Sequence, residues 1–446
     1  MIMTNVKFHL VSLGCPKNQV DSEVMAALLK KGGYEPTSMP ENAHVILINT
    51  CAFILPAKQE AIEEILRMAE WKKQGACRKL VVTGCLPQRY GRILEKELPE
   101  VDLFLGTGEI PQIVKLIRQS GGKTVIGKPR FLMNAGFPRM IAPSVRTAYL
   151  KIAEGCSNRC SYCIIPQIRG PFRSRTPDDL LLEAARLAAD GIWELILIAQ
   201  DTTAYGRDLQ GKPSLSQLIR ELASLKGLQW IRLLYAHPFS LSDDLLKTMA
   251  AEEKICRYLD LPVQHVTDLI LAAMNRKSNR STITETPARV RRLIPGVALR
   301  TSIIVGFPGE TAKQFDELLR FVEETRFENL GVFTYSREEG TAAADLPRQV
   351  SEKVKQKRHD LLMETQAEIS FEINQARIGS QEDVLLEGEN DLPECSADYP
   401  LQGRIRAQAP EIDGLTYVKT KKGKVGDIVR CKITAADIYD LYAEEI

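Results

Sequence analysis

Three cysteines in one short segment carry the strongest chemical signal of this 446-residue sequence. Cys156, Cys160 and Cys163 follow the spacing C-x3-C-x2-C, so a single loop presents three thiols and no fourth. A structural zinc site uses four protein ligands, whereas a 4Fe–4S cube has four irons, usually ligated by four cysteines. Three thiolates on a cube leave one iron open to a small molecule. The segment predicts such a cluster, and three ligands of a zinc ribbon are the alternative.

The same segment resembles the signature of the radical S-adenosylmethionine (SAM) enzymes, in which an aromatic residue, here Tyr162, precedes the last cysteine. The resemblance implies that SAM chelates the fourth iron through its amino and carboxylate groups. It also implies that an electron from the cluster cleaves SAM to a 5′-deoxyadenosyl radical. We therefore expect no catalytic side chain beyond the cluster ligands.

Length and composition favour a soluble protein of two or three domains, with 44% hydrophobic and 26% charged residues. No signal peptide and no apolar run as long as a membrane span is evident in the sequence. We therefore expect a cytoplasmic protein without a membrane partner, and a monomer. In a reducing compartment, ten cysteines favour metal or redox chemistry over a disulfide framework.

Near the N-terminus, three strand patterns are rich in apolar and β-branched residues, and each closes on a cysteine: 7–15, 44–51 and 79–85. A helical pattern follows each of them: 21–31, 56–73 and 88–97. We expect the first helix to begin with Asp21 or Ser22 as its N-cap. The alternation of strand and helix predicts an open parallel α/β sheet.

Such sheets bind ligands at the carboxyl ends of their strands. Cys15, Cys51 and Cys85 stand just past the ends of three strands, so they are predicted to converge on a second 4Fe–4S cluster with three protein ligands. Their being small buried hydrophobes is the alternative. Cys77 precedes its strand and belongs at the opposite end of the sheet. The remaining cysteines lack partners and are expected to be structural: Cys256, Cys395 and Cys431.

A Gly/Pro-rich stretch at 121–143 is predicted to be a linker. Six strand patterns then alternate with helices and predict a partial (β/α)6 barrel: 148–153, 195–200, 230–236, 257–263, 299–305 and 330–335. A charged helix over 351–375 closes this unit. Four short strands follow and predict a small antiparallel β-barrel: 383–386, 401–407, 416–419 and 428–435. The fold class is α/β, with domains at 1–142, 143–376 and 377–446.

Residues at the predicted strand ends near the Cys156 loop are candidates for binding a cofactor. Gly306, like Gly309, lets backbone approach a flat ligand, and this turn is similar to the segment that packs on the adenine of SAM in the same superfamily. His237 and His265 are assigned no catalytic role, since a lone histidine is more often structural. The predicted cofactor contacts are Tyr162, Gln200, Asp201, Arg300, Gly306 and Glu310. For Asp201, a turn or helix cap is the alternative, and Arg276 and Arg300 are suited to pairing with a carboxylate.

Several motifs together resemble the radical SAM methylthiotransferases over essentially the whole chain. They are Gly14-Cys-Pro-Lys-Asn18, the three N-terminal cysteines, the Cys156 loop, Val305-Gly-Phe-Pro-Gly-Glu310 and the C-terminal barrel, which is similar to a TRAM domain. The resemblance implies two 4Fe–4S clusters and two roles for SAM. One SAM methylates sulfur held at the N-terminal cluster. A second yields the radical, which removes a hydrogen before the methylthio group is transferred.

Within that family, three variants resemble the branch that modifies the β-carbon of an aspartate in a small-subunit ribosomal protein: 14–18, 200–205 and 409–414. Charge supports this substrate. Residues 377–446 hold nine Lys/Arg and fourteen Asp/Glu, a net of −5 that leaves +7 for the rest of a +2 chain. RNA-binding modules are usually basic, so an acidic module suits a basic ribosomal protein better.

Two other functions stay open at this point. The first is the same chemistry on an isopentenylated adenosine of tRNA, and the basic turn 419–424 allows a secondary contact with nucleic acid. The second is a non-catalytic iron–sulfur sensor or electron carrier, for which an open iron has no use. The favoured enzyme requires an external electron donor.

Overall fold

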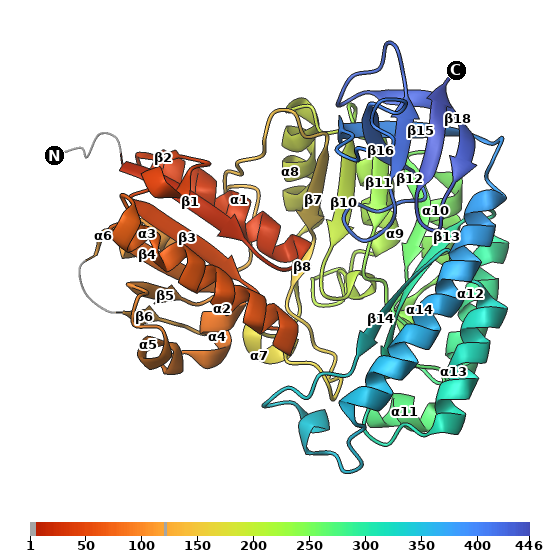
Figure 1. The fold of residues 1–446 in the computed structure, drawn as a ribbon, viewed down its shortest axis with the longest axis horizontal. Helices are drawn as coiled ribbons and strands as arrows, with labels where there is room; N and C mark the ends of the chain where they lie inside the picture. Colours follow the sequence, from red (N-terminus) through yellow and green to blue (C-terminus); the bar gives the residue numbers. More distant parts are fainter. Residues whose placement is uncertain (1–5, 120–122) are drawn as a thin grey trace.

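The computed structural model describes residues 6–119 and 123–446, which form two parallel α/β sheets and one closed barrel (Figure 1). The predicted fold class is confirmed. The N-terminal sheet has the order β2-β1-β3-β4-β5-β6, and all of its described pairings are parallel. Its strands are β1 (Val6–Ser12), β2 (Tyr34–Pro36), β3 (Val45–Thr50), β4 (Lys79–Gly84), β5 (Leu103–Leu105) and β6 (Thr124–Val125).

Helices follow the strands of this sheet, as the alternating pattern predicts. They are α1 (Pro16–Lys31), α2 (Leu55–Ala69), α3 (Trp71–Gln74), α4 (Cys85–Tyr90), α5 (Ile93–Glu97) and α6 (Ile113–Arg118). β3 lies at the centre, and every one of its residues is buried, which explains its continuous apolar run. Cys77 precedes β4 and so lies at the end of the sheet opposite Cys85, as predicted.

The expectations for the helices of this region are wrong in part. Helix α1 begins at Pro16 with Cys15 as its N-cap, so Asp21 and Ser22 lie inside the helix. Proline at the first helical position is a start signal that outweighs the capping propensity of later residues. The pattern at 88–97 is two helices, because Gly91 at φ +52° ends α4.

The stretch 121–143 is not a free linker, because β6 lies within it and extends the sheet beside β5. Met133 and Ala135 are buried as well, so the segment packs against the body of the protein. Residues 121 and 122 lie outside the described part of the chain.

The central sheet has the order β14-β13-β12-β11-β10-β7, with every neighbouring pair parallel. The six predicted strands are all present: β7 (Thr147–Lys151), β10 (Glu194–Ile198), β11 (Trp230–Leu233), β12 (Ile255–Asp260), β13 (Ala298–Val305) and β14 (Asn329–Thr334). A short hairpin, β8 (Ala153–Glu154) with β9 (Arg173–Ser174), flanks the Cys156 loop. The sheet does not close on itself, which matches a partial barrel.

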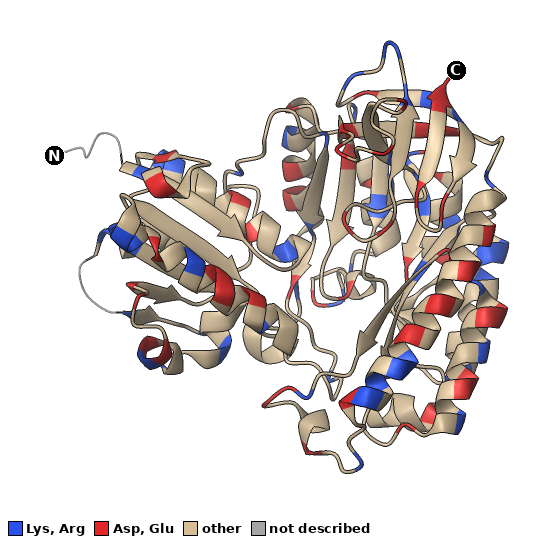
Figure 2. Cartoon of the chain, in the orientation of Figure 1, with Lys and Arg blue, Asp and Glu red and all other residues tan. Residues whose placement is uncertain are grey.

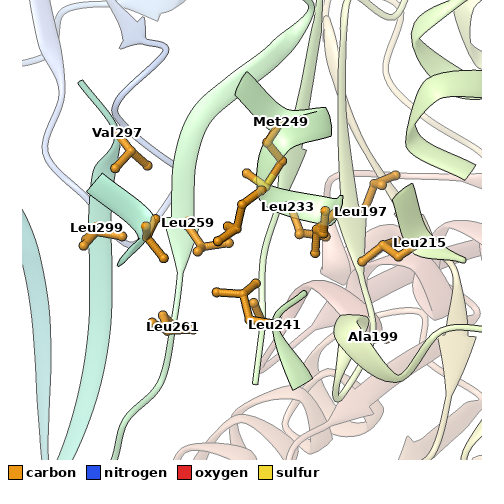
Figure 3. Close-up of a cluster of buried hydrophobic side chains, with 14 of the residues drawn as sticks. Leu197, Ala199, Leu215, Leu233, Leu241, Met249, Leu259, Leu261, Val297 and Leu299 are labelled. Atoms are coloured by element: carbon orange, nitrogen blue, oxygen red, sulfur yellow. The ribbon is translucent and has the colours of Figure 1, made fainter. Parts of the chain in front are cut away.

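Side chains alternate across the central strands and give the sheet two different faces. Leu197, Leu233, Leu259 and Leu299 belong to one apolar cluster with helix residues such as Met249 (Figure 3). The surrounding helices are α8 (Pro177–Ala189), α9 (Leu215–Ala223), α10 (Asp243–Ala251), α11 (Asp268–Ala273), α12 (Arg280–Leu293), α13 (Ala312–Thr325) and α14 (Glu352–Gln375). The short helix α7 (Ile165–Arg169) packs instead on α4 of the N-terminal unit. The other face carries buried polar residues, among them Arg232, Asp260 and Arg300, beside apolar ones such as Trp230 and Tyr258.

Charged residues concentrate on the helices rather than on the strands. Figure 2 shows Lys, Arg, Asp and Glu spread along α13 and α14 at one side of the molecule. The predicted helix 351–375 corresponds closely to α14, which packs on β14 and α13. No helix among the described residues is long and apolar enough to span a lipid bilayer.

The C-terminal unit is a closed barrel in the order β15-β16-β17-β19-β18. Its strands are β15 (Gln381–Glu389), β16 (Leu401–Ile405), β17 (Thr416–Lys419), β18 (Ile428–Ala436) and β19 (Leu441–Glu445). Four were predicted, and β19 completes the closure. The barrel is antiparallel except where β17 pairs with β19 in parallel.

Candidate functional site

The N-terminal cysteines lie together at the carboxyl edge of the first sheet. Cys51 directly follows β3, Cys85 is the first residue of α4 after β4, and Cys15 caps α1. Their backbones are close enough that a Cβ on Gly14 would lie 2.7 Å from the Cβ of Cys51. Gly14 has a φ of +92°, so the turn after β1 depends on its missing side chain.

Asn18 holds this group of cysteines, called here the first trio, in place. Its amide donates to the backbone oxygens of Leu13, at 2.9 Å, and Thr50, at 3.0 Å, and so ties the turns after β1 and β3 together. Its Oδ1 lies 3.8 Å from Cys85 Sγ and accepts a hydrogen bond from Arg169. Sequence reasoning quoted Asn18 within a motif but assigned it no role, because its partners are distant in sequence.

The second trio, Cys156, Cys160 and Cys163, lies on the loop between β8 and α7. The loop is fixed from outside, since Asn158 donates to Asp201 at 2.8 Å and Ser161 Oγ donates to the Ala273 oxygen at 2.7 Å. This places the trio at the carboxyl ends of the central strands, the position predicted for it.

Burial disfavours the thiolate form of several of these cysteines. Burial raises the pKa of Cys163 to about 12 and that of Cys156 to about 11. Burial also raises the pKa of Cys85 to about 12, although the Arg169 guanidinium opposes the rise. The charges of Cys51 and Cys15 add to the rise at Cys85. Such thiols become thiolates where a metal displaces their protons.

The donor atoms of each trio are three thiols that form no disulfide. Among residues 6–119 and 123–446, no three His, Cys, Asp or Glu side chains form a group that could hold one metal ion. In a 4Fe–4S cube each thiolate binds a different iron, so its ligands stand farther apart than those of one zinc ion. Three free thiols at each site match the donor set that a cube with one open iron requires.

A buried ionic network joins the two trios. Asp21 accepts from Lys151 at 2.5 Å and from Arg169 at 2.6 Å. Lys151 also donates to Glu154 at 2.8 Å, two residues before Cys156, while Arg169 reaches Cys85 Sγ at 3.6 Å. Burial alone would raise the pKa of Glu154, but Lys151 and Arg169 lower it to about 2. The network runs from the first sheet to the central one without an exposed member.

Gln200 and Asp201, two of the predicted cofactor contacts, lie beside the second trio. Gln200 donates to Glu154 at 2.9 Å, and its Oε1 is buried without a hydrogen-bond partner among the described residues. That orphaned oxygen is able to accept a hydrogen bond from a bound ligand. Asp201 is already occupied by Asn158 and by the hydroxyl of Thr203, at 2.7 Å, so it acts on the loop.

Tyr162 and Arg276 form a second pair at this trio. The Arg276 guanidinium donates to the Tyr162 hydroxyl at 3.2 Å and to the backbone oxygen of Pro262 at 2.7 Å. Tyr162 also packs against an apolar cluster that contains Met274 and Phe307. Arg276 meets no carboxylate within hydrogen-bonding distance among the described residues.

Arg300 lies on the polar face of β13 and is ion-paired twice. It reaches Asp260, at the end of β12, at 3.3 Å and Asp413 of the C-terminal barrel at 3.4 Å. Asp413 also accepts from the Tyr258 hydroxyl at 2.7 Å. Arg300 therefore connects the central sheet to the C-terminal barrel, a role that its sequence position did not reveal.

Gly306 and Glu310 belong to one tight turn after β13. Glu310 accepts from the amides of Gly306, at 2.5 Å, and Phe307, at 3.1 Å, and pairs with Arg358 at 3.2 Å. Gly306 has a φ of +72° and packs against Lys355 of α14. The turn holds one oxygen of Glu310, Oε2, while Oε1 is buried beside Arg358 without a hydrogen-bond partner among the described residues.

Lys17 is a further site residue that sequence reasoning did not single out. It is 7% exposed, and its Nζ lies 3.2 Å from the centre of the Tyr235 ring. Burial lowers the pKa of Lys17, while the negative charges of Cys15 and Asp260 oppose the change. In the sequence, only its position two residues after Cys15 indicated that Lys17 belongs to the site.

The two lone histidines have partners of their own. His265 Nδ1 accepts from the Thr267 amide at 3.1 Å, and burial lowers its pKa to about 3. His237 accepts from the Phe239 amide at 3.3 Å, and burial lowers its pKa to about 4. Both are neutral near pH 7, which fits structural roles.

Comparison with known families divides the chain into three matching parts. Residues 7–106 match the family described as uncharacterized protein family UPF0004, residues 150–322 match the radical SAM superfamily, and residues 378–446 match the TRAM domain. The two parallel sheets and the barrel each contain one of these matches. The radical SAM match implies a 4Fe–4S cluster and SAM.

Curated relatives match over nearly the full chain. Ribosomal protein uS12 methylthiotransferase RimO of Syntrophus aciditrophicus is 57% identical, covering 100% of this chain and 99% of its own. The proteins of the same name from Geotalea uraniireducens and Geobacter sulfurreducens are each 53% identical, covering 98% and 99% of this chain and 98% of their own.

Solved structures of more distant proteins share the fold. TsrM from Kitasatospora setae, a radical SAM methyltransferase with cobalamin and a 4Fe–4S cluster bound, gives a TM-score of 0.55 at 14% identity, covering 76% of this chain and 74% of its own. The cobalamin-dependent SAM radical enzyme OxsB gives 0.51 at 12% identity, covering 81% of this chain and 56% of its own.

Proposed function

The chain belongs to the RimO family of radical SAM methylthiotransferases, and from this we propose that it inserts a methylthio group at the β-carbon of an aspartate in ribosomal protein uS12. Full-length identity above 50% to relatives named for this activity supports the substrate. The net charge of −5 on residues 377–446 also favours a basic protein over tRNA.

Each trio of cysteines is proposed to ligate one 4Fe–4S cluster. Cys156, Cys160 and Cys163 would hold the cluster that binds SAM, and the first trio, Cys15, Cys51 and Cys85, would hold the other. When bound, the two clusters would supply the electron that cleaves SAM and a site for the sulfur that is transferred. The convergence of the thiols at two sheet edges supports both assignments.

The protein's own groups would orient SAM and keep water out. Gln200 is proposed to accept a hydrogen bond from SAM through its partnerless Oε1, beside Tyr162. Asp201 would fix the loop of the second trio through Asn158. Arg300, Gly306 and Glu310 were predicted to touch the cofactor, and we propose that they shape the walls around it.

The observation that carries the proposal is the buried network between the trios. Asp21, Arg169 and Lys151 connect a cysteine of one sheet with the loop of the other, although they come from distant parts of the sequence. A sensor or electron carrier has no need to fix two three-cysteine sites against each other at this cost in buried charge. An enzyme that passes a group between two centres needs those centres held in a fixed relation.

The rest of the assignment follows from the ribosomal substrate. We propose a cytoplasmic monomer that receives electrons from a separate donor protein. Its domains are proposed to span 1–142, 143–376 and 377–446. Contact with nucleic acid through 419–424 would be secondary.

Anaerobic reconstitution tests the proposal directly. Iron and sulfide are counted on the wild type and on two triple alanine variants, one for each trio, and each variant is expected to keep about half of the iron. Purified uS12 and tRNA carrying isopentenylated adenosine are then assayed by mass spectrometry. A methylthio group only on tRNA would refute the choice of substrate, and zinc in place of iron would refute the chemistry.

A further inference from the structure

Lys17 differs from the other buried cations of the site. Its ammonium is packed over the Tyr235 ring at 3.2 Å, and no carboxylate or carbonyl of the described residues accepts a hydrogen bond from it. The charges of Cys15 and Asp260 also act on it, but neither side chain accepts a hydrogen bond from it. A buried ammonium without an anion is costly, so its retention calls for a partner that arrives from outside.

The neighbouring cations are already paired. Lys151 binds Asp21 and Glu154, and Arg300 binds Asp260 and Asp413. Arg169 is likewise held by Asp21 and Asn18. Arg276 lacks a carboxylate but lies at the second trio, where its guanidinium is held by Tyr162 and Pro262. Arg276 and Arg300 each keep a buried Nε without a hydrogen-bond partner, but both guanidiniums have other contacts. Lys17 is the cation of this group that forms no hydrogen bond or ion pair with another described residue.

The platform beneath Lys17 is held in a strained conformation. Tyr235 has a φ of +61°, which is rare for a residue with a side chain. Its amide donates to Asp260 at 3.0 Å, and its oxygen accepts from the Thr202 amide at 3.1 Å, so both backbone groups are fixed. Strain that surrounding contacts enforce is typical of binding sites. The ring contacts the ammonium but leaves its three N–H donors without acceptors.

We propose that Lys17 binds the side-chain carboxylate of the substrate aspartate and so selects aspartate over uncharged residues. The inference rests on the proposed function and names the residue that recognises the substrate there. Lys17 stands two residues after Cys15 in the first turn of α1, so a carboxylate bound to it would bring the adjacent β-carbon toward the first trio. The pairing neutralises two charges that would each be unfavourable alone in this buried place.

A charge-balancing role is the competing explanation, since Lys17 is also near the thiol of Cys15. In that role Lys17 would stabilise the cluster and would be indifferent to the substrate side chain. The two explanations differ in one observable, the preference for aspartate over asparagine.

The test compares two peptides of uS12, one with the target aspartate and one with asparagine in its place. Their binding to reconstituted enzyme with SAM present is measured by fluorescence anisotropy. Wild type is expected to prefer the aspartate peptide by about 30-fold, the effect of one charged hydrogen-bonded pair. Lys17→Met keeps the apolar stem over Tyr235 and is expected to reduce the preference to less than about 3-fold.

Lys31→Met is the matched control, because Lys31 is exposed at the end of the same helix, and it is expected to keep the full preference. Lys17→Gln is the second variant, which keeps hydrogen-bonding groups without the charge. If either Lys17 variant still prefers the aspartate peptide, the inference is overturned. It is also overturned if both variants lose iron, because Lys17 would then support the cluster rather than the substrate. Failure of wild type to bind or modify either peptide would instead refute the proposed function.

Discussion

The two cysteine trios are built in opposite ways. Cys15, Cys51 and Cys85 come from three separate strand ends and meet only when the first sheet is formed. Cys156, Cys160 and Cys163 share one loop and are neighbours even in the unfolded chain. The first trio is therefore a product of tertiary structure, and the second is a local motif that other parts of the protein hold in place.

This difference determines where each site is vulnerable. The first trio depends on close backbone approach between turns, through Gly14, Gly84 and the hydrogen bonds of Asn18. The second depends on contacts from outside its loop, such as that of Asn158 with Asp201. Substitutions at these two kinds of support are expected to affect one trio and spare the other.

The largest effect is expected from Gly84→Ala. Gly84 has a φ of +95°, and a Cβ there would lie 2.7 Å from the backbone oxygen of Thr50 and would also collide with Asn49. Backbone cannot yield as a flexible side chain does, so we expect a loss of about 4 kcal/mol in the free energy of unfolding. The variant should keep only the iron of the second trio. Urea denaturation and iron counting measure both results.

Gly211→Ala is the control for that substitution. Gly211 also has a positive φ, +75°, but no atom lies within 4 Å of the Cβ position. Its cost is confined to the backbone conformation, about 1 kcal/mol, and its iron content should equal that of the wild type. If both variants lost the same stability and the same iron, the positive φ of the glycine, and not the close approach of the turns, would be what supports the first trio.

An ionic network away from both trios provides the second test. Burial alone would raise the pKa of Glu194, but Arg404 and Arg232 lower it to about 2. The unfolded value is about 4.3, so the network contributes about 3 kcal/mol of stability well above that pH, and this contribution is lost progressively as the pH falls from about 5 to 1. Glu194 joins the central sheet to the C-terminal barrel, so unfolding there should respond first.

Unfolding curves between pH 2 and 6 check this expectation, with Glu194→Gln as the comparison. The variant lacks the titrating carboxyl and should show a smaller change with pH over that range. If the stability of the wild type changed with pH no more than that of the variant, Glu194 and its two arginines would not make stability depend on pH. The iron content at pH 7 should not differ between the two proteins, because neither trio contacts Glu194.

The comparison of trios also explains what the sequence could predict. The strands before Cys51 and Cys85 are apolar runs that end at the cysteine, so both the sheet and the convergence were predictable from local pattern. The beginning of α1 was misplaced because Pro16 was not read as a start signal. Asp21 was taken for a cap for the same reason, and the structure shows it paired with Lys151, 130 residues away.

Residues that act through distant partners could not be found in this way. Lys17 and Asn18 sit in a recognisable motif, but the ring of Tyr235 and the guanidinium of Arg169 reach them only in the folded protein. The reverse holds for Glu310, whose motif suggested a ligand contact although its partners are the amides of its own turn. The local sequence pattern predicts helices, strands and types of ligand. Contacts between side chains of different sheets have to be observed in the folded protein.

Asn18→Ala is expected to cost about 2 kcal/mol. The substitution leaves the buried backbone oxygens of Leu13 and Thr50 without their donor and deprives Arg169 of an acceptor. The turns that carry Cys15 and Cys51 then lose their connection, so iron at the first trio should fall while iron at the second remains. Iron counting with and without the second trio, removed by triple alanine substitution, separates these two pools.

Asn158→Ala is the matched change at the second trio and should have the smallest effect. It removes one hydrogen bond, 2.8 Å long, between the loop and Asp201, in a region that is partly exposed. We expect about 1 kcal/mol and retention of both iron pools, because the three thiols remain in one short loop whatever its external contacts. Weaker binding of SAM, measured by equilibrium dialysis, is the expected sign of the loosened loop. If Asn158→Ala instead removed as much iron as Asn18→Ala, the second trio would depend on tertiary contacts as much as the first, and the distinction between a local and an assembled site would fail.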